Sequence, residues 1–245
     1  MVETSKIAWK RLSIEAVAIV ASILLAFAID AWWKDRVEVE LEQRLLSALL
    51  VEFDQNAELL REARTFYEQR YMEALRILNY LEDGVTDLDQ AEIGEDLRGL
   101  LISHSMHLES GSHDGLLASG ELSLIRDEDL RNRLAAWPSY VKEWSEEQEM
   151  VFSYVRRELY PALANSVRVR TIARDFAAFP DGESPPLAPR GAKEEIATIN
   201  VDNIVAFDNL VYGRAQGLWY AMRDGETLLA RTTAITELIR QYLDN

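Results

Sequence analysis

The chain has 245 residues, of which 48% are hydrophobic, so it is long and apolar enough for one folded domain of ordinary size. It has no cysteine, which excludes disulfides and thiolate metal sites. With 26 Lys and Arg against 42 Asp and Glu, its formal charge is −16. That sign excludes nucleic acid and anionic lipid surfaces as partners, because both need clustered cations.

Residues 12–33, LSIEAVAIVASILLAFAIDAWW, form a nearly continuous apolar run. Its length matches the ~20 residues that an α-helix needs to cross a bilayer. Trp32 and Trp33 end the run, and cations lie just outside it, as is usual for a membrane-spanning helix. We therefore predict a short lead over 1–11, a transmembrane helix over 12–33 in contact with membrane lipid, and a helical domain over 34–245. The run is longer than the ~7–15-residue core of a cleaved signal peptide, so we expect an uncleaved anchor.

The orientation of this span is set by the cations that flank it. Three lie on each side, namely Lys6, Lys10 and Arg11 before the run, and Lys34, Arg36 and Arg44 after it. The acidic residues that follow the span favour an amino terminus in the cytoplasm. We therefore expect a bacterial inner-membrane protein with its large domain in the periplasm, and the opposite orientation stays open.

Two carboxylates, Glu15 and Asp30, lie inside the span, where a charged group costs about 2.5–3.5 kcal/mol at the centre and less towards the ends. In one interpretation both are close enough to the headgroups to stay hydrated. In the other, helical phase places them on one stripe with Ala18, Ser22 and Ala26. Small residues four positions apart let a second helix approach closely. We favour a span that packs against partner spans, either its own copies or another integral membrane protein.

After the span, residues 38–81 follow the spacing of an amphipathic helix and contain no Gly or Pro. One rigid stalk helix continuous with the span is expected, although periodicity leaves open a break near residues 30–33. A second helix is predicted over about 89–106, followed by a loop over 109–114 and a short helix through Leu116 and Leu117.

Gly120 predicts a turn, and Asp127 predicts the cap of a helix that runs to about residue 160, kinked or restarted at Pro138 and ended or bent at Pro161. Residues 176–195 hold four of the six prolines and predict a surface loop. The helical pattern resumes at about 202 and continues to the end. Almost nothing alternates with period two, so the fold class is all-α: an antiparallel bundle of four to six helices on the span.

Two motifs resemble a widespread family of bacterial single-span membrane proteins known only as a domain of unknown function. The first is a glutamate that opens an apolar span, an acid and Trp that close it, and a Glu- and Leu-rich helix behind it, here Glu15, Asp30, Trp32 and 40–60. The second comprises Leu117, Ser119, Gly120, Leu122, Leu124, Ile125, Asp127, Leu130, Arg131 and Leu134. The family often has an aromatic residue where this chain has His113-Asp114. The resemblance implies an anchor and a helical domain, and no activity.

All three histidines, His104, His107 and His113, fall within a short stretch that also holds Glu109 and Asp114. Two histidines on one helical face and a third on the next loop could bind zinc or another divalent ion, although the spacing matches no known ligand motif. Histidines at a helix end are equally good C-terminal caps. Since the second interpretation is simpler, we expect no cofactor.

Arg98 and His104 show the Arg-x5-His spacing found in the HEPN class of helical ribonucleases, but Gly99 replaces the polar residue usual there. Of the remaining tryptophans, Trp137, Trp144 and Trp219 are assigned to the core in preference to a ligand-stacking cage.

The sequence contains no Gly-rich phosphate loop, no nucleophile elbow and no dinucleotide fingerprint. Our first hypothesis is therefore a non-enzymatic interaction protein, a homo-oligomeric or accessory subunit of a bacterial membrane assembly. The second is an extracytoplasmic sensor or ligand-binding domain, although only about eleven residues remain for output on the other side. The third is a membrane-tethered metal-dependent hydrolase or nuclease that uses the histidines. A ring of spans whose Glu15 lines a pore is a further variant.

Overall fold

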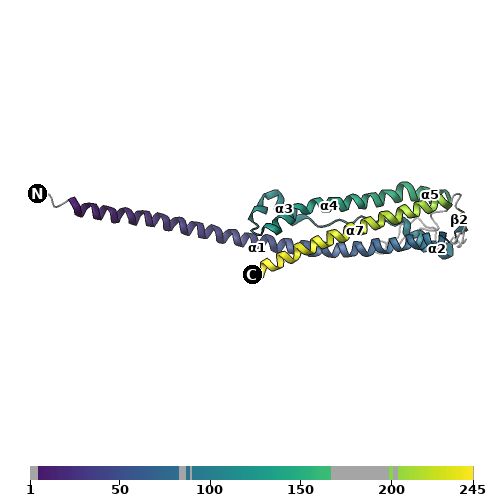
Figure 1. Ribbon diagram of the computed structural model, residues 1–245, viewed down its shortest axis with the longest axis horizontal. Coiled ribbons are helices and arrows are strands. Elements are labelled where there is room, and N and C mark those ends of the chain that lie inside the picture. The colour runs from purple at the N-terminus through teal and green to yellow at the C-terminus, as the bar shows by residue number, and fades with distance from the viewer. Residues whose placement is uncertain (1–4, 83–86, 89, 167–198, 201–203, 245) are drawn as a thin grey trace, which may run out of the picture.

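The computed structural model describes residues 5–82, 87–88, 90–166, 199–200 and 204–244, and the fold is all-α (Figure 1). The elements in chain order are α1 (Ser5–Glu82), β1 (Asp87–Leu88), α2 (Gln90–Leu101), α3 (Gly111–Ser119), the 3₁₀ turn η1 (Glu121–Leu124), α4 (Glu128–Tyr154), the π-helical turn η2 (Val155–Leu159), α5 (Tyr160–Ser166), β2 (Ile199–Asn200) and α7 (Ile204–Leu243). β1 and β2 form a two-residue antiparallel pair. The expected loop over 176–195 lies outside the described residues.

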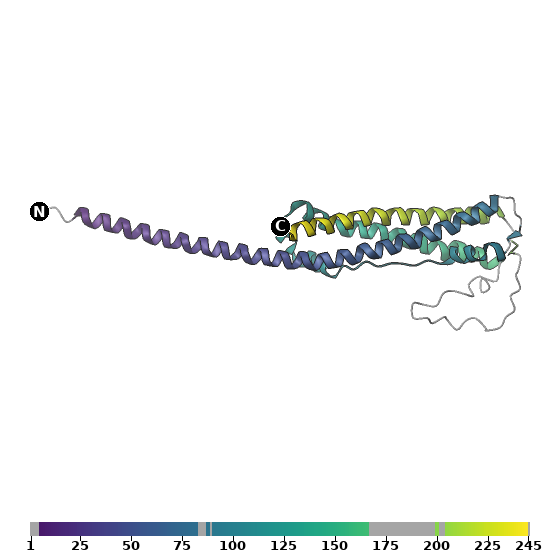
Figure 2. The ribbon, with the colours of Figure 1, turned by 90° about the horizontal axis from the view of Figure 1, so that it is seen from below.

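α1 is one helix of 78 residues, so the expected continuity of span and stalk is confirmed and there is no break at residues 30–33. At 1.5 Å per residue it is ~117 Å long. Its first part stands alone and the rest enters the bundle (Figures 1 and 2). The uninterrupted backbone hydrogen bonds fix the direction of the bundle relative to that first part.

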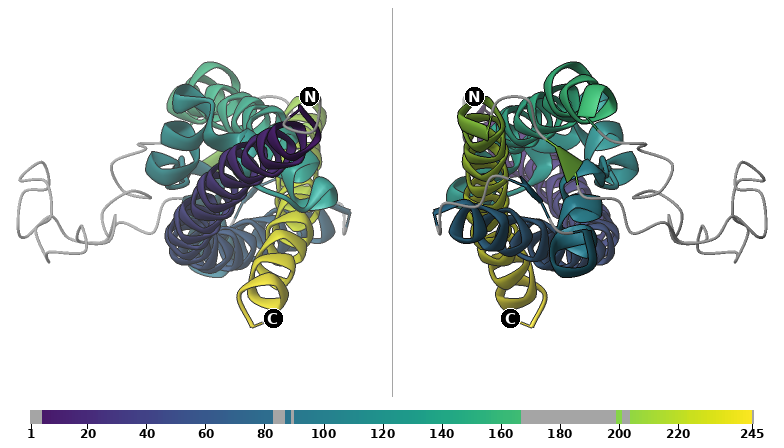
Figure 3. Two further views of the ribbon diagram at one scale, coloured as in Figure 1. Left: turned by 90° about the vertical axis from the view of Figure 1, so that its left-hand side faces the viewer. Right: turned by 90° about the vertical axis from the view of Figure 1, so that its right-hand side faces the viewer.

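The bundle has an up-down-up-down path (Figure 1), and Figure 3 shows its helices end-on. α1 and α4 run away from the free end of α1, whereas α7 returns towards it and packs along both. Ion pairs between α1 and α7 mark this antiparallel register, with Asp54 bound to Arg240 and Arg64 bound to Glu226. The carboxyl terminus therefore lies near the point where α1 enters the bundle.

The second arm of the bundle is only half helical, which corrects the helix predicted over 89–106. α2 ends at Leu101, and residues 102–110 form an extended segment. α3 then begins at Gly111, inside the loop predicted over 109–114. Side chains of neighbouring helices take the place of the missing helical hydrogen bonds. Asn56 bonds both the N–H and the C=O of Glu109, at 2.7 and 2.8 Å, and Gln148 does the same for Met106, at 2.8 and 3.3 Å.

α4 begins as predicted at an Asp127 cap, whose carboxylate accepts a 2.8 Å hydrogen bond from the Leu130 N–H. Pro138 lies inside this helix and does not end it. A proline removes one N–H and strains one turn, a local cost that the packed neighbours of this long helix offset. Pro161 does not end the helical path either, because it lies in the first turn of α5, which continues to Ser166.

The core consists of two apolar clusters, and a buried polar layer lies between them along the bundle axis. The cluster nearer the span contains Phe53, Trp137 and Trp144, and the distal cluster contains Ile77, Leu97 and Phe207. Where the two meet, the buried residues are Arg70 and Glu73 on α1 and Arg214 on α7. Charged side chains are rarely this buried, because a buried charge without a partner is costly. These three side chains therefore need hydrogen-bond or ion-pair partners in the middle of the bundle.

We predict that Trp137→Ala lowers the free energy of unfolding by about 3–5 kcal/mol, as is typical for a buried aromatic side chain. Trp137 is 2% exposed and its ring lies 4.8 Å from that of Phe53. Thermal and urea unfolding of the full chain in detergent, followed by circular dichroism, measures the loss. Trp219→Ala is the control, since Trp219 is only half-buried and contacts Tyr220 and Arg223. Equal losses in the two variants would contradict the assigned core.

Candidate functional site: the exposed span and its attachment to the bundle

The amino-terminal part of α1 exposes an apolar surface that no part of the described bundle covers. None of its most apolar 18-residue window is buried, and the helix is long and apolar enough to cross a membrane. The large side chains that are at least half exposed there are Trp9, Leu12, Ile14, Val17, Ile19, Val20, Ile23, Leu24, Leu25, Phe27, Ile29, Trp32 and Trp33. Such a surface is typical of a segment that contacts lipid or other helices.

Both carboxylates of the span are paired with a cation on the same helix. Arg11 Nε lies 3.3 Å from Glu15 Oε1, and Lys34 Nζ lies 2.7 Å from Asp30 Oδ2. Each cation is four residues nearer to the end of the span than its acid. Since Arg11 and Lys34 are ~35 Å apart along the axis, they bracket a ~30 Å hydrocarbon layer. These pairs support the interpretation in which both acids stay near water. The i, i+4 spacing of each acid and its cation was visible in the sequence and could have predicted the pairs.

All residues of the stripe predicted from helical phase are exposed on the surface of α1. They are Glu15, Ala18, Ser22, Ala26 and Asp30. The Ser22 hydroxyl donates a 2.8 Å hydrogen bond to the Ala18 carbonyl, so its donor is satisfied within the helix. A second helix could approach this face without leaving that hydroxyl unpaired.

The rings of Trp32 and Trp33 lie beside each other at the end of the span, with their centroids 6.4 Å apart. The two side chains are 60% and 61% exposed. Their position suits the interfacial role expected of them.

Glu42 joins α1 to the bundle at the first turn that the bundle covers. Its fully buried carboxylate accepts 2.7 Å hydrogen bonds from the backbone N–H of Arg126 and from the Tyr242 hydroxyl. The Arg126 guanidinium also binds Asp35 at 2.5 Å. We call Asp35, Glu42, Arg126 and Tyr242 the Glu42 clamp. It ties the start of α4 and the end of α7 to α1 just beyond the span.

The Glu42 clamp also raises the pKa of the Tyr242 phenol. Burial, and then the hydrogen bond and the charge of Glu42, raise the pKa of Tyr242 from 10.0 to about 12. The phenol therefore stays protonated, and able to donate to the carboxylate, well above physiological pH.

The three histidines do not come together in this structure. His104 and His107 are exposed on the extended segment, where the His104 ring lies against Phe66. His113 is 1% exposed, and its Nε2 lies 2.8 Å from the Leu134 carbonyl. Among the residues that the structure describes, no three His, Cys, Asp or Glu side chains could hold a metal ion together. The geometry gives the metal hypothesis no support.

Arg98 and His104, which the sequence suggested as a pair, also lie apart. Arg98 pairs with Glu95 in the last turn of α2, whereas His104 lies beyond the end of that helix. Trp137 and Trp144 are core residues, as expected. Trp219 is half-buried on the surface of α7, so it is not a core residue like the other two.

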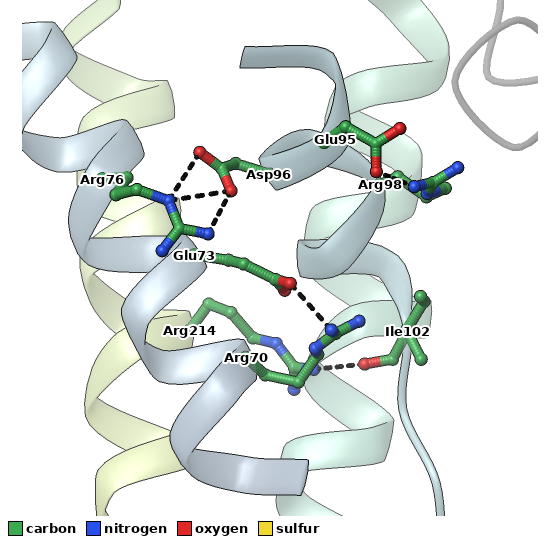
Figure 4. A network of polar contacts seen from close by, with 8 residues as sticks. All are labelled: Arg70, Glu73, Arg76, Glu95, Asp96, Arg98, Ile102 and Arg214. Carbon is green, nitrogen blue, oxygen red and sulfur yellow. Dashed lines mark hydrogen bonds and ion pairs between the residues drawn. The ribbon is translucent and has the colours of Figure 1, made fainter.

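The buried polar layer is the arrangement that sequence reasoning missed, and Figure 4 shows it. Arg214 donates to the carbonyls of Val151 and Ile102, at 3.1 and 2.8 Å, so it holds the point where α2 unwinds. Arg70 and Glu73 pair at 2.7 Å, and Arg76 binds Asp96 through two of its nitrogens. In the described part of the chain, Arg70 Nε, Glu73 Oε2 and Arg214 Nε are buried and have no hydrogen-bond partner.

Burial is the main influence on ionisation in this layer. It raises the pKa of Glu73 against the opposing effect of Arg70, and it lowers the pKa of Arg214. Both shifts disfavour the charged forms. The layer is therefore costly, and it is maintained by the two clusters packed on either side of it.

Two signals in the sequence could have revealed these residues. Glu42, Asn56 and Arg214 occupy core-facing positions of otherwise apolar helical patterns, where a polar residue usually has a buried partner. In addition, polar and apolar residues alternate over 105–109, as they do in an extended segment.

Comparisons with protein-family models, with curated proteins and with solved structures give no match for this chain. The similarity to the family of uncharacterised single-span proteins stays a prediction from the two motifs.

We predict that Gly99→Ala destabilises the protein by about 1–3 kcal/mol, the usual cost of overpacking. A Cβ at residue 99 would collide with the Glu73 carboxylate and push it off Arg70. In a Glu73→Ala background the same substitution should cost nothing or stabilise α2, because the collision is gone and Ala favours a helix. Urea denaturation of the wild type, the two single variants and the double variant gives four unfolding free energies. Together these measure the coupling between residues 73 and 99. Gly115→Ala is the control, since nothing lies within 4 Å of its new methyl group.

We predict that stability falls as pH rises from 10 to about 12, because the folded-state pKa values of Tyr67 and Tyr242 are about 12 against an ordinary 10.0. A raised folded-state pKa gives stabilisation that is complete below pH 10 and lost as pH approaches 12. Tyr242→Phe should flatten this dependence, and the thermal midpoint measured across that range reports it. An unchanged slope in the variant would show that the phenol of Tyr242 does not couple to folding.

Proposed function

We propose that this chain is a single-pass, membrane-anchored helical protein that acts without enzymatic activity as a homo-oligomeric or accessory subunit of a bacterial membrane assembly. The observation that carries the proposal is the wholly exposed apolar segment 12–33, which continues as one helix into a packed bundle. A soluble domain would bury such a segment or lack it.

The span offers two kinds of surface, which suit lipid and protein respectively. Large apolar side chains such as Ile19, Leu24 and Phe27 suit contact with lipid tails. The stripe of Ala18, Ser22 and Ala26, with a satisfied hydroxyl and an acid at each end, suits close helix packing. A partner span on this stripe would cover the small-residue face between the two paired acids, so that this face would contact protein and not lipid tails.

The rigid helix and the Glu42 clamp support a structural role for the bundle. A partner that rotates or tilts the span would move the bundle by the same angle, because no break separates them. An interaction subunit needs this fixed geometry, since its bundle must meet other components at a defined position above the membrane.

We predict that the chain extracted in nanodiscs or mild detergent gives a defined complex by native mass spectrometry. A homo-oligomer or a stoichiometric partner is the expected result. Ala18→Leu, Ser22→Leu and Ala26→Leu together should dissociate it, because leucines on the stripe prevent close approach of a second helix. Ala21→Leu with Ala28→Leu is the matched control, since these positions lie on the other side of the span.

A bare monomer in the wild-type sample would contradict the proposal of a packing subunit. Dissociation by the control pair as well as by the stripe variant would show that general disturbance of the span, and not the stripe, controls assembly.

A further inference from the structure

The small-residue stripe of the exposed segment lies on the side of α1 that faces away from the bundle. Ser22 is 27 residues before Leu49, and Ala26 is 27 residues before Phe53, in one uninterrupted helix. At 3.6 residues per turn this separation is about 7.5 turns, so the two members of each pair point in opposite directions from the helix axis. Leu49 and Phe53 are buried in the core where α1 enters the bundle. A helix on the stripe would therefore not collide with the helices that pack on α1.

Beyond the stripe, the same side of α1 carries an exposed row that we call the outer seam. It consists of Val37, Glu40, Arg44, Ser47 and Val51. Val51 is 29 residues after Ser22, which is about eight turns, so the two point to the same side. The spacing in the seam alternates between three and four residues, as in the contact line between two helices of a coiled coil. Val37 and Val51 are 50% and 59% exposed, so the seam has apolar surface to bury.

The charges of the outer seam are balanced within one chain. Arg44 Nη2 lies 2.5 Å from Glu40 Oε1, and both acids of the stripe are paired with cations of their own helix. The whole chain carries −16, so two copies repel each other over most of their surfaces. A side without net charge is where two copies can approach. The seam also offers no uncompensated charge that would select a foreign partner of opposite sign.

We propose that a second copy of this chain packs in parallel on this side of α1, with the two outer seams in contact and the two bundles on opposite sides of the pair. The inference rests on the proposed function and deepens it, because it names the partner and the face. Two spans that enter the membrane from the same side are parallel. The stripe of Ala18, Ser22 and Ala26 lets the spans approach closely. Val37 and Val51 then pack against their own copies above the span.

Glu40 and Arg44 select the register of this pair. With the two copies in register, both Glu40 carboxylates and both Arg44 guanidiniums lie in one cluster, and each acid has a cation of either chain within reach. A shift by one heptad would instead place Arg44 against Val37 or Val51 and leave its charge on an apolar side chain. Polar residues at a few positions of a coiled-coil seam specify the register in this way, at some cost in stability.

The absence of cysteine makes the test direct, because one introduced thiol is the only one in the chain. Full-length Val37→Cys and Val51→Cys carry it on the outer seam. Glu38→Cys is the matched control, since Glu38 is also exposed but lies about 160° from Ser22 around the helix. A disulfide needs two Cα atoms within about 7 Å, so it links two copies only through residues at their contact. Each variant is reconstituted into liposomes and oxidised, and the dimer is measured on a non-reducing gel.

Residues 37 and 51 are expected to link most of the protein into dimers, whereas residue 38 should link little. Circular dichroism checks that each variant keeps the helical fold. Equal linking at residues 37 and 38 would indicate random collisions and overturn the seam. Failure of residue 37 or 51 to link, while native mass spectrometry still finds a homo-oligomer or a stoichiometric foreign partner, would overturn this inference and leave the proposed function standing. A monomer by mass spectrometry, with no linking at any position, would remove both.

Discussion

The rest of the structure depends on the unbroken hydrogen-bond ladder of α1. A helix of 78 residues satisfies its own backbone from the lead segment to the far end of the bundle. In hydrocarbon this is one of only two ways to cross, because unpaired N–H and C=O groups are too costly there. In the bundle the same helix presents the face on which α2, α3, α4 and α7 assemble. One element therefore carries both the candidate membrane span and the register of the fold.

Buried polar groups fix the register of the elements in three places along the bundle axis. At the end of the bundle next to the exposed apolar segment, Glu42 holds the start of α4 and the end of α7. In the middle, Asn56 and Gln148 hold the extended segment by pairing with its backbone, much as a neighbouring β-strand would. Further out, Arg214 holds the residues where α2 ends. Each contact is specific to one axial position, because an unpaired buried polar group costs about 1–3 kcal/mol.

These contacts explain why the second arm is not a full helix. Helix propensity alone allows residues 102–106 to continue α2, as the sequence analysis expects. The two amides and Arg214 offer partners to the backbone of Ile102, Met106 and Glu109 that an intact helix could not use. The half-buried positions of Met106 and Leu108 add apolar contact with the core. Tertiary partners thus outweigh a weak local preference.

The sequence by itself determined the elements whose signal is local and repeated. A mostly apolar run of 22 residues with flanking cations predicted the span. The heptad-like spacing of 38–81 predicted its continuation, and Asp127 predicted the start of α4. The stripe from Glu15 to Asp30 follows from helical phase alone, so it was predictable as well.

Only the tertiary structure decided which distant groups meet. It separated the histidines that proximity in sequence had grouped, since the ring of His113 faces the Leu134 carbonyl while His104 and His107 lie on the extended segment. It also brought Arg214 to Ile102 and Tyr242 to Glu42, across more than a hundred residues in each case. The physical reason is that periodicity reports which face of an element is buried. The partner of each buried polar group depends on how the elements pack, which a local pattern does not encode.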